Sequence, residues 1–181
     1  MKNSKVTFPL SRKIAVMVIA IAIILSTVLI AAFTEHYRQE MIDDFERMAM
    51  DVAAIAATQL NPDKFPTYLD TGVKDEEYQY AFEQLSKFRE SADVEYLYVV
   101  VPKPDEVWYV MDTDPTEGQI PLGYHQPYYE GEFAKNAERM VRGERIKPIV
   151  SNEEYGWLMS AYYPLQTSSG DPAGYVGVDI L

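Results

Sequence analysis

The spacing of hydrophobic positions differs between successive segments of this chain of 181 residues. Residues 14–33 contain no charged side chain. About twenty apolar residues, each rising 1.5 Å along a helix, cross a hydrocarbon core of ~30 Å, so this run predicts a transmembrane helix. The alternative is a cleaved secretory signal. Its apolar core is usually only about 7–15 residues long, so the anchor is the favoured interpretation.

The helix is predicted to continue beyond the membrane. Residues 35–60 contain no proline or glycine and are rich in helix-forming residues. Within them, apolar residues are spaced alternately four and three apart, at Met41, Phe45, Met48, Val52 and Ile55. This seam predicts either contact with a second copy in a homodimer or packing on the core of the domain itself.

Asn61-Pro62 ends this helix, and residues 61–74 are predicted to form a loop. Asp75 is positioned to cap a second helix over residues 76–91. Runs rich in β-branched and aromatic residues then predict five strands, over residues 94–101, 107–112, 147–151, 157–164 and 175–180. Between the second and third strands, residues 113–129 are irregular, and residues 130–142 are predicted to form a short helix.

Helices grouped ahead of antiparallel strands predict an α+β domain with a five-stranded antiparallel sheet. We expect the long helix to cover one face of this sheet. The irregular stretch and the short helix would cover the other face and enclose a pocket. The predicted organisation is a basic cytoplasmic tip (1–13), a transmembrane helix (14–33) and one domain of ordinary size (34–181).

Charge predicts the orientation in the cell membrane. Residues 1–13 contain four basic residues and no acidic one, whereas the rest of the chain holds all 28 Asp and Glu. Basic flanks stay in the cytoplasm, so residues 34–181 are predicted to be extracytoplasmic. An acidic external domain is a poor partner for nucleic acid.

The residues give no sign of catalysis. The absence of cysteine excludes disulfides, thiolate metal sites and cysteine nucleophiles. The sequence also lacks HExxH, a phosphate loop and a serine-centred elbow, so we predict no enzyme activity, no catalytic residue and no cofactor. Asp112, Asp114 and Glu117 could offer oxygens to a cation, but their spacing departs from an EF-hand. An Asx turn without metal is therefore the favoured interpretation.

The order of motifs resembles the extracytoplasmic Cache sensor domains of bacterial receptors, which have a PAS-like sheet. The motifs are YLYVV, VWYVMD, a glycine-punctuated loop, EEYGWLMSAYYPL, a Gly-Asp turn and GYVGVDI, and the resemblance covers residues 35–181 as a single module. It implies a signal-transduction receptor that binds a small molecule and transmits binding through helix 35–60. Such receptors continue into a second span and an output domain, so we expect the chain to be an amino-terminal fragment. A ligand-free dimerisation or protein-interaction module is the alternative.

Candidate ligand-binding residues come from the strands and from the irregular stretch. Alternation along each strand places Tyr109 and Met111 on one face, and likewise Ser160 and Tyr162. The uncharged candidate ligand-binding residues are Tyr98, Tyr109, Met111, Tyr124, Tyr128, Ser160 and Tyr162.

The remaining candidates are charged. Arg145 and Lys147 belong to the basic cluster of this acidic domain and are our choices for binding an anionic ligand, with a small carboxylate favoured. Alternatively, these bases offset acids at a solvated helix end. Asp179 stands where the family can bind an amine, but no arginine precedes Trp108-Tyr109 at the expected spacing. Amino acid recognition is therefore not predicted, and Asp179 is alternatively a strand-end carboxylate bonded to a backbone amide.

Overall fold

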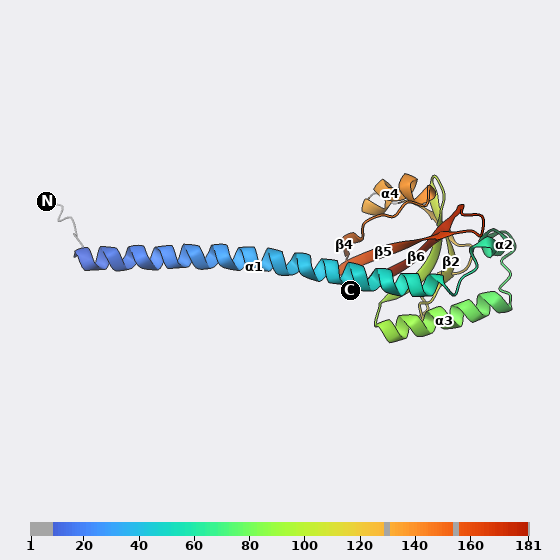
Figure 1. Cartoon of the computed structure of the whole chain (residues 1–181), viewed down its shortest axis with the longest axis horizontal. Coiled ribbons are helices and arrows are strands. Elements are labelled where there is room, and N and C mark those ends of the chain that lie inside the picture. Colours follow the sequence, from blue (N-terminus) through green and yellow to red (C-terminus); the bar gives the residue numbers. More distant parts are fainter. Residues whose placement is uncertain (1–8, 129–130, 154–155, 181) are drawn as a thin grey trace. The chain divides into compact units, whose positions relative to one another are not determined.

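The computed structural model describes residues 9–128, 131–153 and 156–180, and the chain forms two compact units, Met1–Asp44 and Phe45–Leu181. Helix α1 (Leu10–Ala57) begins in the first unit and ends in the second (Figure 1). This confirms that the apolar run and the helix predicted after it are one continuous helix. Most of the predicted basic tip and the last residue of the predicted irregular stretch, Tyr129, lie outside the described residues.

The described part of the first unit is the amino-terminal portion of α1. Its large apolar side chains are exposed from Ile14 to Phe33. By length and composition, α1 is able to cross a membrane. An apolar surface all around a helix suits contact with lipid.

The second unit is an α+β domain with one antiparallel sheet, as predicted. Its strand order is β3-β2-β1-β6-β5-β4, which agrees with a PAS-like sheet. The strands are β1 (Tyr96–Pro102), β2 (Glu106–Asp112), β3 (His125–Pro127), β4 (Ile149–Glu153), β5 (Gly156–Gln166) and β6 (Pro172–Ile180). Five correspond to the predicted strands. The sixth, β3, lies in the stretch predicted to be irregular and pairs with β2 at the sheet edge.

A single carboxylate ties this short edge strand to β2. Glu106 accepts hydrogen bonds from Trp108 Nε1 at 2.7 Å and lies 2.8 Å from His125 Nδ1. The rings of Trp108 and His125 stack with their centroids 4.3 Å apart. Three residues would form a weak strand by backbone pairing alone, so these side-chain contacts help to fix its position.

The prediction of a loop over residues 61–74 was wrong. This segment contains the 3-10 helix η1 (Pro62–Lys64) and helix α2 (Phe65–Thr71). Proline is tolerated in the first turn of a helix because its missing N–H would have no partner there. Pro62 and Pro66 therefore begin helices, and Gly72, with φ of 68°, ends α2 in the left-handed conformation.

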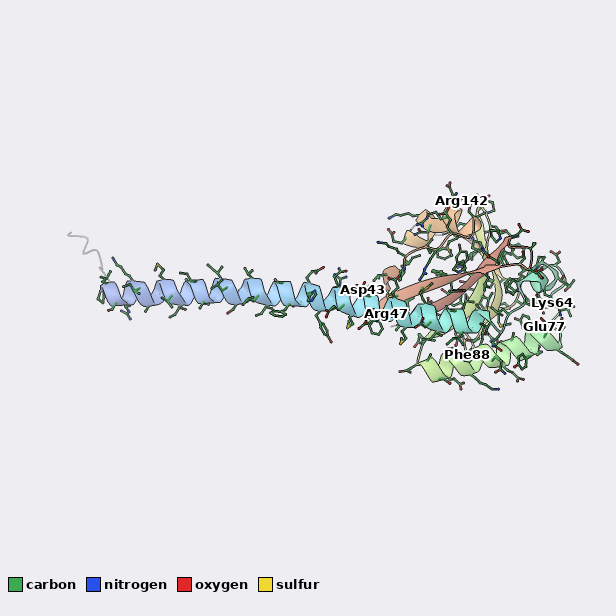
Figure 2. All side chains as sticks on the ribbon, viewed as in Figure 1. Asp43, Arg47, Lys64, Glu77, Phe88 and Arg142 are labelled. Atoms are coloured by element: carbon green, nitrogen blue, oxygen red, sulfur yellow. The ribbon has the colours of Figure 1, made fainter. Side chains whose placement is uncertain are left out.

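Helix α3 (Glu76–Ala92) begins as predicted, because Asp75 accepts a hydrogen bond from the Tyr78 backbone N–H at 2.9 Å. Asp75 also accepts hydrogen bonds from Lys64 Nζ at 2.7 Å and from the Tyr68 hydroxyl at 3.0 Å. Lys64 pairs in addition with Glu77 at 2.6 Å; both residues are labelled in Figure 2. The bond from Lys64, with further bonds from Tyr78 and Tyr68, lowers the pKa of Asp75 to about 2. This network joins the start of α3 to η1 and α2.

The sheet has two faces with different cover (Figure 1). The helical face packs against α1, α2 and α3, with buried Leu97, Val99, Val176 and Val178 from the strands and Ala49, Ala53 and Leu85 from the helices. The opposite face, called the cavity face below, carries Tyr98, Val100, Tyr162 and Tyr175 and packs against Met140 of helix α4 (Glu132–Val141). The predicted cover of both faces is therefore confirmed.

A β-bulge in β2 changes which side chains reach the cavity face. Val99 pairs with Met111 and Val100 pairs with Tyr109, which leaves Val110 as an extra residue. The Tyr78 hydroxyl donates a hydrogen bond to the Val110 carbonyl oxygen at 2.9 Å. A bulge inserts one residue into the alternation, so Tyr109 is on the cavity face and Met111 packs in the core of the helical face.

Candidate functional site

A cavity of about 360 Å³ opens on the cavity face. Its floor comes from the strands and includes Tyr98, Tyr109, Ser160, Tyr162 and Asp179. Its cover comes from β3, the start of α4 and nearby residues, namely Gln126, Pro127, Tyr128, Gly131, Glu132 and Phe133. Within the described part of the chain, no lysine or arginine lines this cavity.

Aromatic rings form a continuous surface along the cavity. The ring of Tyr98 lies 6.0 Å from that of Tyr109 and 6.3 Å from that of Tyr162, between centroids. Phe133 continues the row, 5.2 Å from Tyr162 and 5.6 Å from Tyr128. The faces of such rings carry partial negative charge and attract cations within about 6 Å. The cavity wall is therefore suited to a positively charged group.

Asp179 is the buried charge at the floor of this cavity. Its side chain is 7% exposed, and no described lysine or arginine forms an ion pair with it. The Tyr98 hydroxyl donates to Asp179 Oδ1 at 3.1 Å and lies 3.0 Å from the Tyr162 hydroxyl. Asp179 is thus bonded to a tyrosine hydroxyl, and among the described residues no backbone N–H donates to its side chain, whereas the alternative interpretation expected one to do so.

Burial alters the protonation of this cluster. Loss of hydration raises the pKa of Asp179 to about 7, although hydrogen bonds with Ser160 and Tyr98 oppose the shift. Burial also raises the pKa of both Tyr98 and Tyr162, so their hydroxyls remain neutral donors. The cavity therefore holds a carboxyl group that changes charge near neutral pH.

Gly177 allows Tyr98 to reach Asp179. It pairs with Tyr98 on β1 and with Tyr162 on β5. A Cβ atom at position 177 would lie 2.3 Å from Cε2 of the Tyr98 ring, far inside van der Waals contact. The missing side chain leaves the space that this ring occupies over β6.

A second cavity of about 480 Å³ adjoins the first and shares Tyr98, Tyr109 and Asp179 with it. Its other wall is the turn after β2. Asp112 Oδ1 accepts a hydrogen bond from Asp114 N at 3.1 Å, and Asp114 Oδ1 accepts one from Thr116 N at 2.8 Å. These bonds confirm the predicted Asx turn. The described residues contain no cluster of three or more acidic or histidine side chains able to hold a metal ion.

The structure brings six of the ten predicted ligand-binding residues together around the first cavity: Tyr98, Tyr109, Tyr128, Ser160, Tyr162 and Asp179. Period-two alternation correctly placed Ser160 and Tyr162 on the same face, because β5 pairs with β6 without a bulge at these residues. The structure places the other four predicted residues elsewhere.

Met111 is on the helical face because of the bulge at Val110. Tyr124 is 44% exposed and does not line the cavity. It contacts Tyr109 through a backbone hydrogen bond from Tyr109 N to the Tyr124 carbonyl oxygen at 2.8 Å and through its ring, 6.1 Å away between centroids. Arg145 and Lys147 are exposed and do not line the cavity. Solvation of these long basic chains was the alternative interpretation, and their exposure agrees with it.

Sequence reasoning missed several residues that line the first cavity. Ile149 and Ser151 on β4 pair with Ser160 and Leu158 on β5, so the same alternation extended by one strand would have found them. Glu132 and Phe133 come from the first turn of α4. Their amphipathic spacing showed an inward face but not which part of the sheet it covers.

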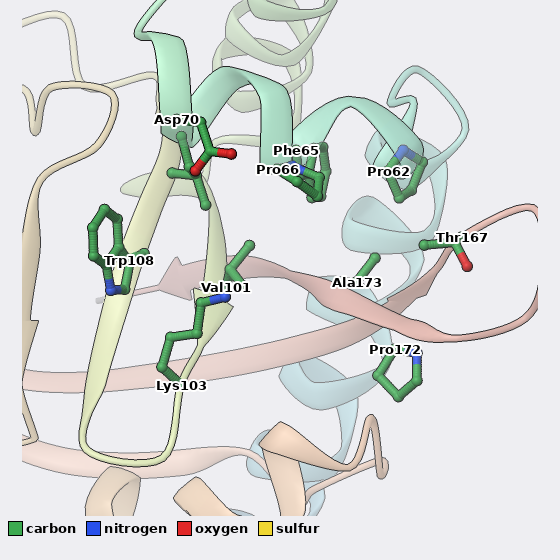
Figure 3. Close-up of a pocket in the computed structure, with 11 residues that line it drawn as sticks. Pro62, Phe65, Pro66, Asp70, Val101, Lys103, Trp108, Thr167, Pro172 and Ala173 are labelled. Atoms are coloured by element: carbon green, nitrogen blue, oxygen red, sulfur yellow. The ribbon is translucent and has the colours of Figure 1, made fainter.

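A third cavity, of about 280 Å³, lies on the helical side of the domain between α2 and the ends of β1 and β6 (Figure 3). Phe65, Leu69, Val101 and Ala173 make most of its surface apolar. Its charged groups, Asp70 and Lys103, are exposed residues. It contains no buried charge, and for this reason the cavity face is the candidate site.

No protein-family model and no curated protein matches the chain. Among solved structures, it is similar to the ligand-binding domain of the Campylobacter jejuni chemoreceptor Tlp3 in complex with 4-methylisoleucine, at 12% identity and a TM-score of 0.38, over 77% of this chain and 59% of that chain. The same domain in complex with L-valine matches at 12% identity and a TM-score of 0.35, over 78% and 62%. The chain thus spans about three fifths of the length of these sensory domains.

Proposed function

We propose that residues 45–181 form the ligand-sensing domain of a membrane-bound receptor, and that the ligand is a small organic molecule with a positively charged amine. One observation carries this proposal. The carboxyl group of Asp179 is buried at the floor of a cavity lined by tyrosines, without a cationic partner among the described residues. A buried carboxylate without a cationic partner is costly, and a bound ammonium group would offset that cost.

The aromatic wall supports the same class of ligand. Tyr98, Tyr109 and Tyr162 present ring surfaces around Asp179, an arrangement that favours an ammonium group over water. A carboxylate, the ligand favoured by the sequence, would meet Asp179 and no described lysine or arginine in this cavity. The proposal therefore takes an amine as the ligand in place of a carboxylate.

Calorimetric titration of the full chain in detergent with small alkylamines and with matching carboxylates tests this function. We expect amines to bind and carboxylates not to bind. Lys147→Ala should leave amine binding unchanged, because Lys147 is exposed and outside the cavity. Binding of carboxylates that disappears in Lys147→Ala would refute the amine site and restore the prediction made from the sequence.

Amine affinity should depend on pH through the ionisation of the Asp179 carboxyl group. An amine binds the ionised carboxylate, and the pKa of Asp179 in the free domain is about 7. Affinity should be constant above this pH and fall by about tenfold for each pH unit below it. The amine itself stays protonated throughout, since alkylamines resemble lysine in pKa. Titrations across this range, in buffers of different ionisation enthalpy, also count the proton that Asp179 releases.

We also propose that the binding signal passes through α1, with residues 34–181 outside the cytoplasm. The last turns of α1 pack on the helical face through Ala49, Ala53 and Ala56. The same helix contains the predicted transmembrane segment. A ligand can shift such a helix only by its different affinities for two states, typically by about 1–3 kcal/mol.

A second candidate function is dimerisation. Phe45 and Val52 pack against the core, but Met41, Met48 and Ile55 are 44%, 37% and 52% exposed and are spaced seven residues apart. Such a stripe is typical of a coiled-coil seam. We expect Ile55→Glu to weaken self-association in analytical ultracentrifugation and to leave amine affinity unchanged. Unaltered self-association in Ile55→Glu would exclude this seam as the dimer contact.

A further inference from the structure

The two adjoining cavities could hold a ligand longer than a small monoamine. Tyr98, Tyr109 and Asp179 line both of them, so a molecule bound at Asp179 in the first cavity has direct access to the second. The second cavity, of about 480 Å³, is the larger. A simple monoamine at Asp179 would leave this space to water.

Asp114 lies in the second cavity with part of its hydrogen-bonding capacity unused. Its side chain is 9% exposed, and Oδ1 accepts the hydrogen bond from Thr116 N. Oδ2 accepts no hydrogen bond from any described residue, and no described lysine or arginine pairs with Asp114. This oxygen can therefore accept a hydrogen bond from a donor group that enters the second cavity.

Gly118 keeps this oxygen accessible. A Cβ atom at position 118 would lie 3.1 Å from Asp114 Oδ2 and 3.2 Å from Thr116 Oγ1. Glycine at this position leaves the space next to the free oxygen unfilled.

Asp112, the other acid of the second cavity, has a different role. Its Oδ1 accepts from Asp114 N, and its Oδ2 accepts from Ile120 N at 2.7 Å. Both oxygens therefore hold the turn in place. Asp112 adds negative potential to the cavity, but Asp114 is the acid with an oxygen available for a ligand.

The walls between the two available acids are aromatic. Tyr96, Tyr98 and Tyr109 line the second cavity. Since the described acids are not grouped as metal ligands, the cation that fits this space is organic. A chain of methylene groups would pack against these rings, as lysine side chains do on apolar surfaces.

Building on the proposed amine function, we propose that the ligand is an aliphatic diamine with one ammonium group at Asp179 and the other at Asp114. The two carboxylates then each receive a charge-assisted hydrogen bond, and the tyrosine rings contact the carbon chain between them. A ligand with only one charged end would satisfy a single acid.

Calorimetric titration of the full chain with three molecules of equal length tests this proposal. Cadaverine has two ammonium groups, aminopentanol has one and a hydroxyl, and pentylamine has one and a methyl group. We expect cadaverine to bind about tenfold or more tightly than aminopentanol, because a hydrogen bond to a charged group is replaced by a neutral one. Asp114→Asn should remove this preference. Glu117→Gln, which changes an exposed acid of the same turn that lies outside the cavity, should retain it.

Equal affinity for cadaverine and aminopentanol in the native protein would overturn the diamine proposal and leave the amine function standing. A cadaverine preference that persists in Asp114→Asn would also overturn it. Absence of binding by all three molecules would refute the amine function, and the diamine with it. The native comparison decides the question even if Asp114→Asn does not fold, and aminopentanol binding reports whether that variant retains its first cavity.

Discussion

Asp179→Asn is expected to abolish amine binding and, at the same time, to stabilise the free domain above neutral pH. Asparagine keeps the shape of the side chain and can still accept the hydrogen bond from the Tyr98 hydroxyl. It removes the charge that binds an ammonium group. Loss of one partner from a buried ion pair costs about 3 kcal/mol or more, so affinity should fall by about 100-fold or more in calorimetric titration.

The gain in stability follows from the raised pKa of Asp179. This carboxyl has a pKa of 3.8 in the reference state and about 7 in the folded domain. Between these values the folded state holds a proton that the unfolded state has released, so stability falls as pH rises from about 4 and levels off above about 7. The loss at about pH 8 is of the order of 4 kcal/mol, and the neutral asparagine avoids it.

Urea unfolding of native and Asp179→Asn protein at about pH 5 and pH 8 would measure this effect. The stability advantage of the variant should be about 2–3 kcal/mol larger at the higher pH, because the native protein loses stability across this interval. Asp105→Asn, at an exposed position of the β1–β2 turn, is the matched control. If Asp179→Asn is destabilised equally at both pH values, the carboxyl is not held protonated by burial.

Gly177→Ala is expected to disrupt the site through Tyr98. The new Cβ atom would lie 2.3 Å from the Tyr98 ring, so the ring must leave its position over β6. Its hydrogen bond to Asp179 would break, and the aromatic wall would lose its central ring. We expect amine affinity to fall by about tenfold or more, and the free energy of unfolding to fall by about 1–3 kcal/mol from overpacking.

The comparison with a Tyr98→Ala background tests this explanation. Without the tyrosine ring, an alanine at position 177 has space, so Gly177→Ala should then cost little in stability. A double-mutant cycle measured by urea unfolding gives the coupling between the two positions. An equal cost of Gly177→Ala in both backgrounds would show that the clash with Tyr98 is not its cause.

Local chemistry made most of the fold predictable. The Asp75 cap, the proline- and glycine-free stretch before Asn61 and the runs of β-branched residues each specify an element through short-range interactions. Helix α2 was missed because Pro62 and Pro66 indicate a loop and the start of a helix equally well. Strand β3 was missed because three residues are too few to establish an alternation.

The site was less predictable than the fold, because its composition depends on contacts between distant segments. Tyr98, Tyr162 and Asp179 come from three strands, and alternation places each on a face but does not show which face is open. Arg145 and Lys147 were chosen for their charge, whereas the structure leaves both in solvent. The charge that marks the site is instead a buried acid without a basic partner, and burial is a property that a single sequence does not report.

The bulge at Val110 keeps a carboxylate on the cavity side at the end of β2. If the same residues alternated without a bulge after Tyr109, Met111 would face the second cavity and Asp112 would face the apolar core. Deleting Val110 would instead leave Met111 paired with Val99 and Asp112 paired with Tyr98, each on its present face. The bulge therefore accommodates one extra residue without changing the electrostatic sign of the binding surface. A related chain that lacks this residue could keep the same cavity chemistry on a regular strand.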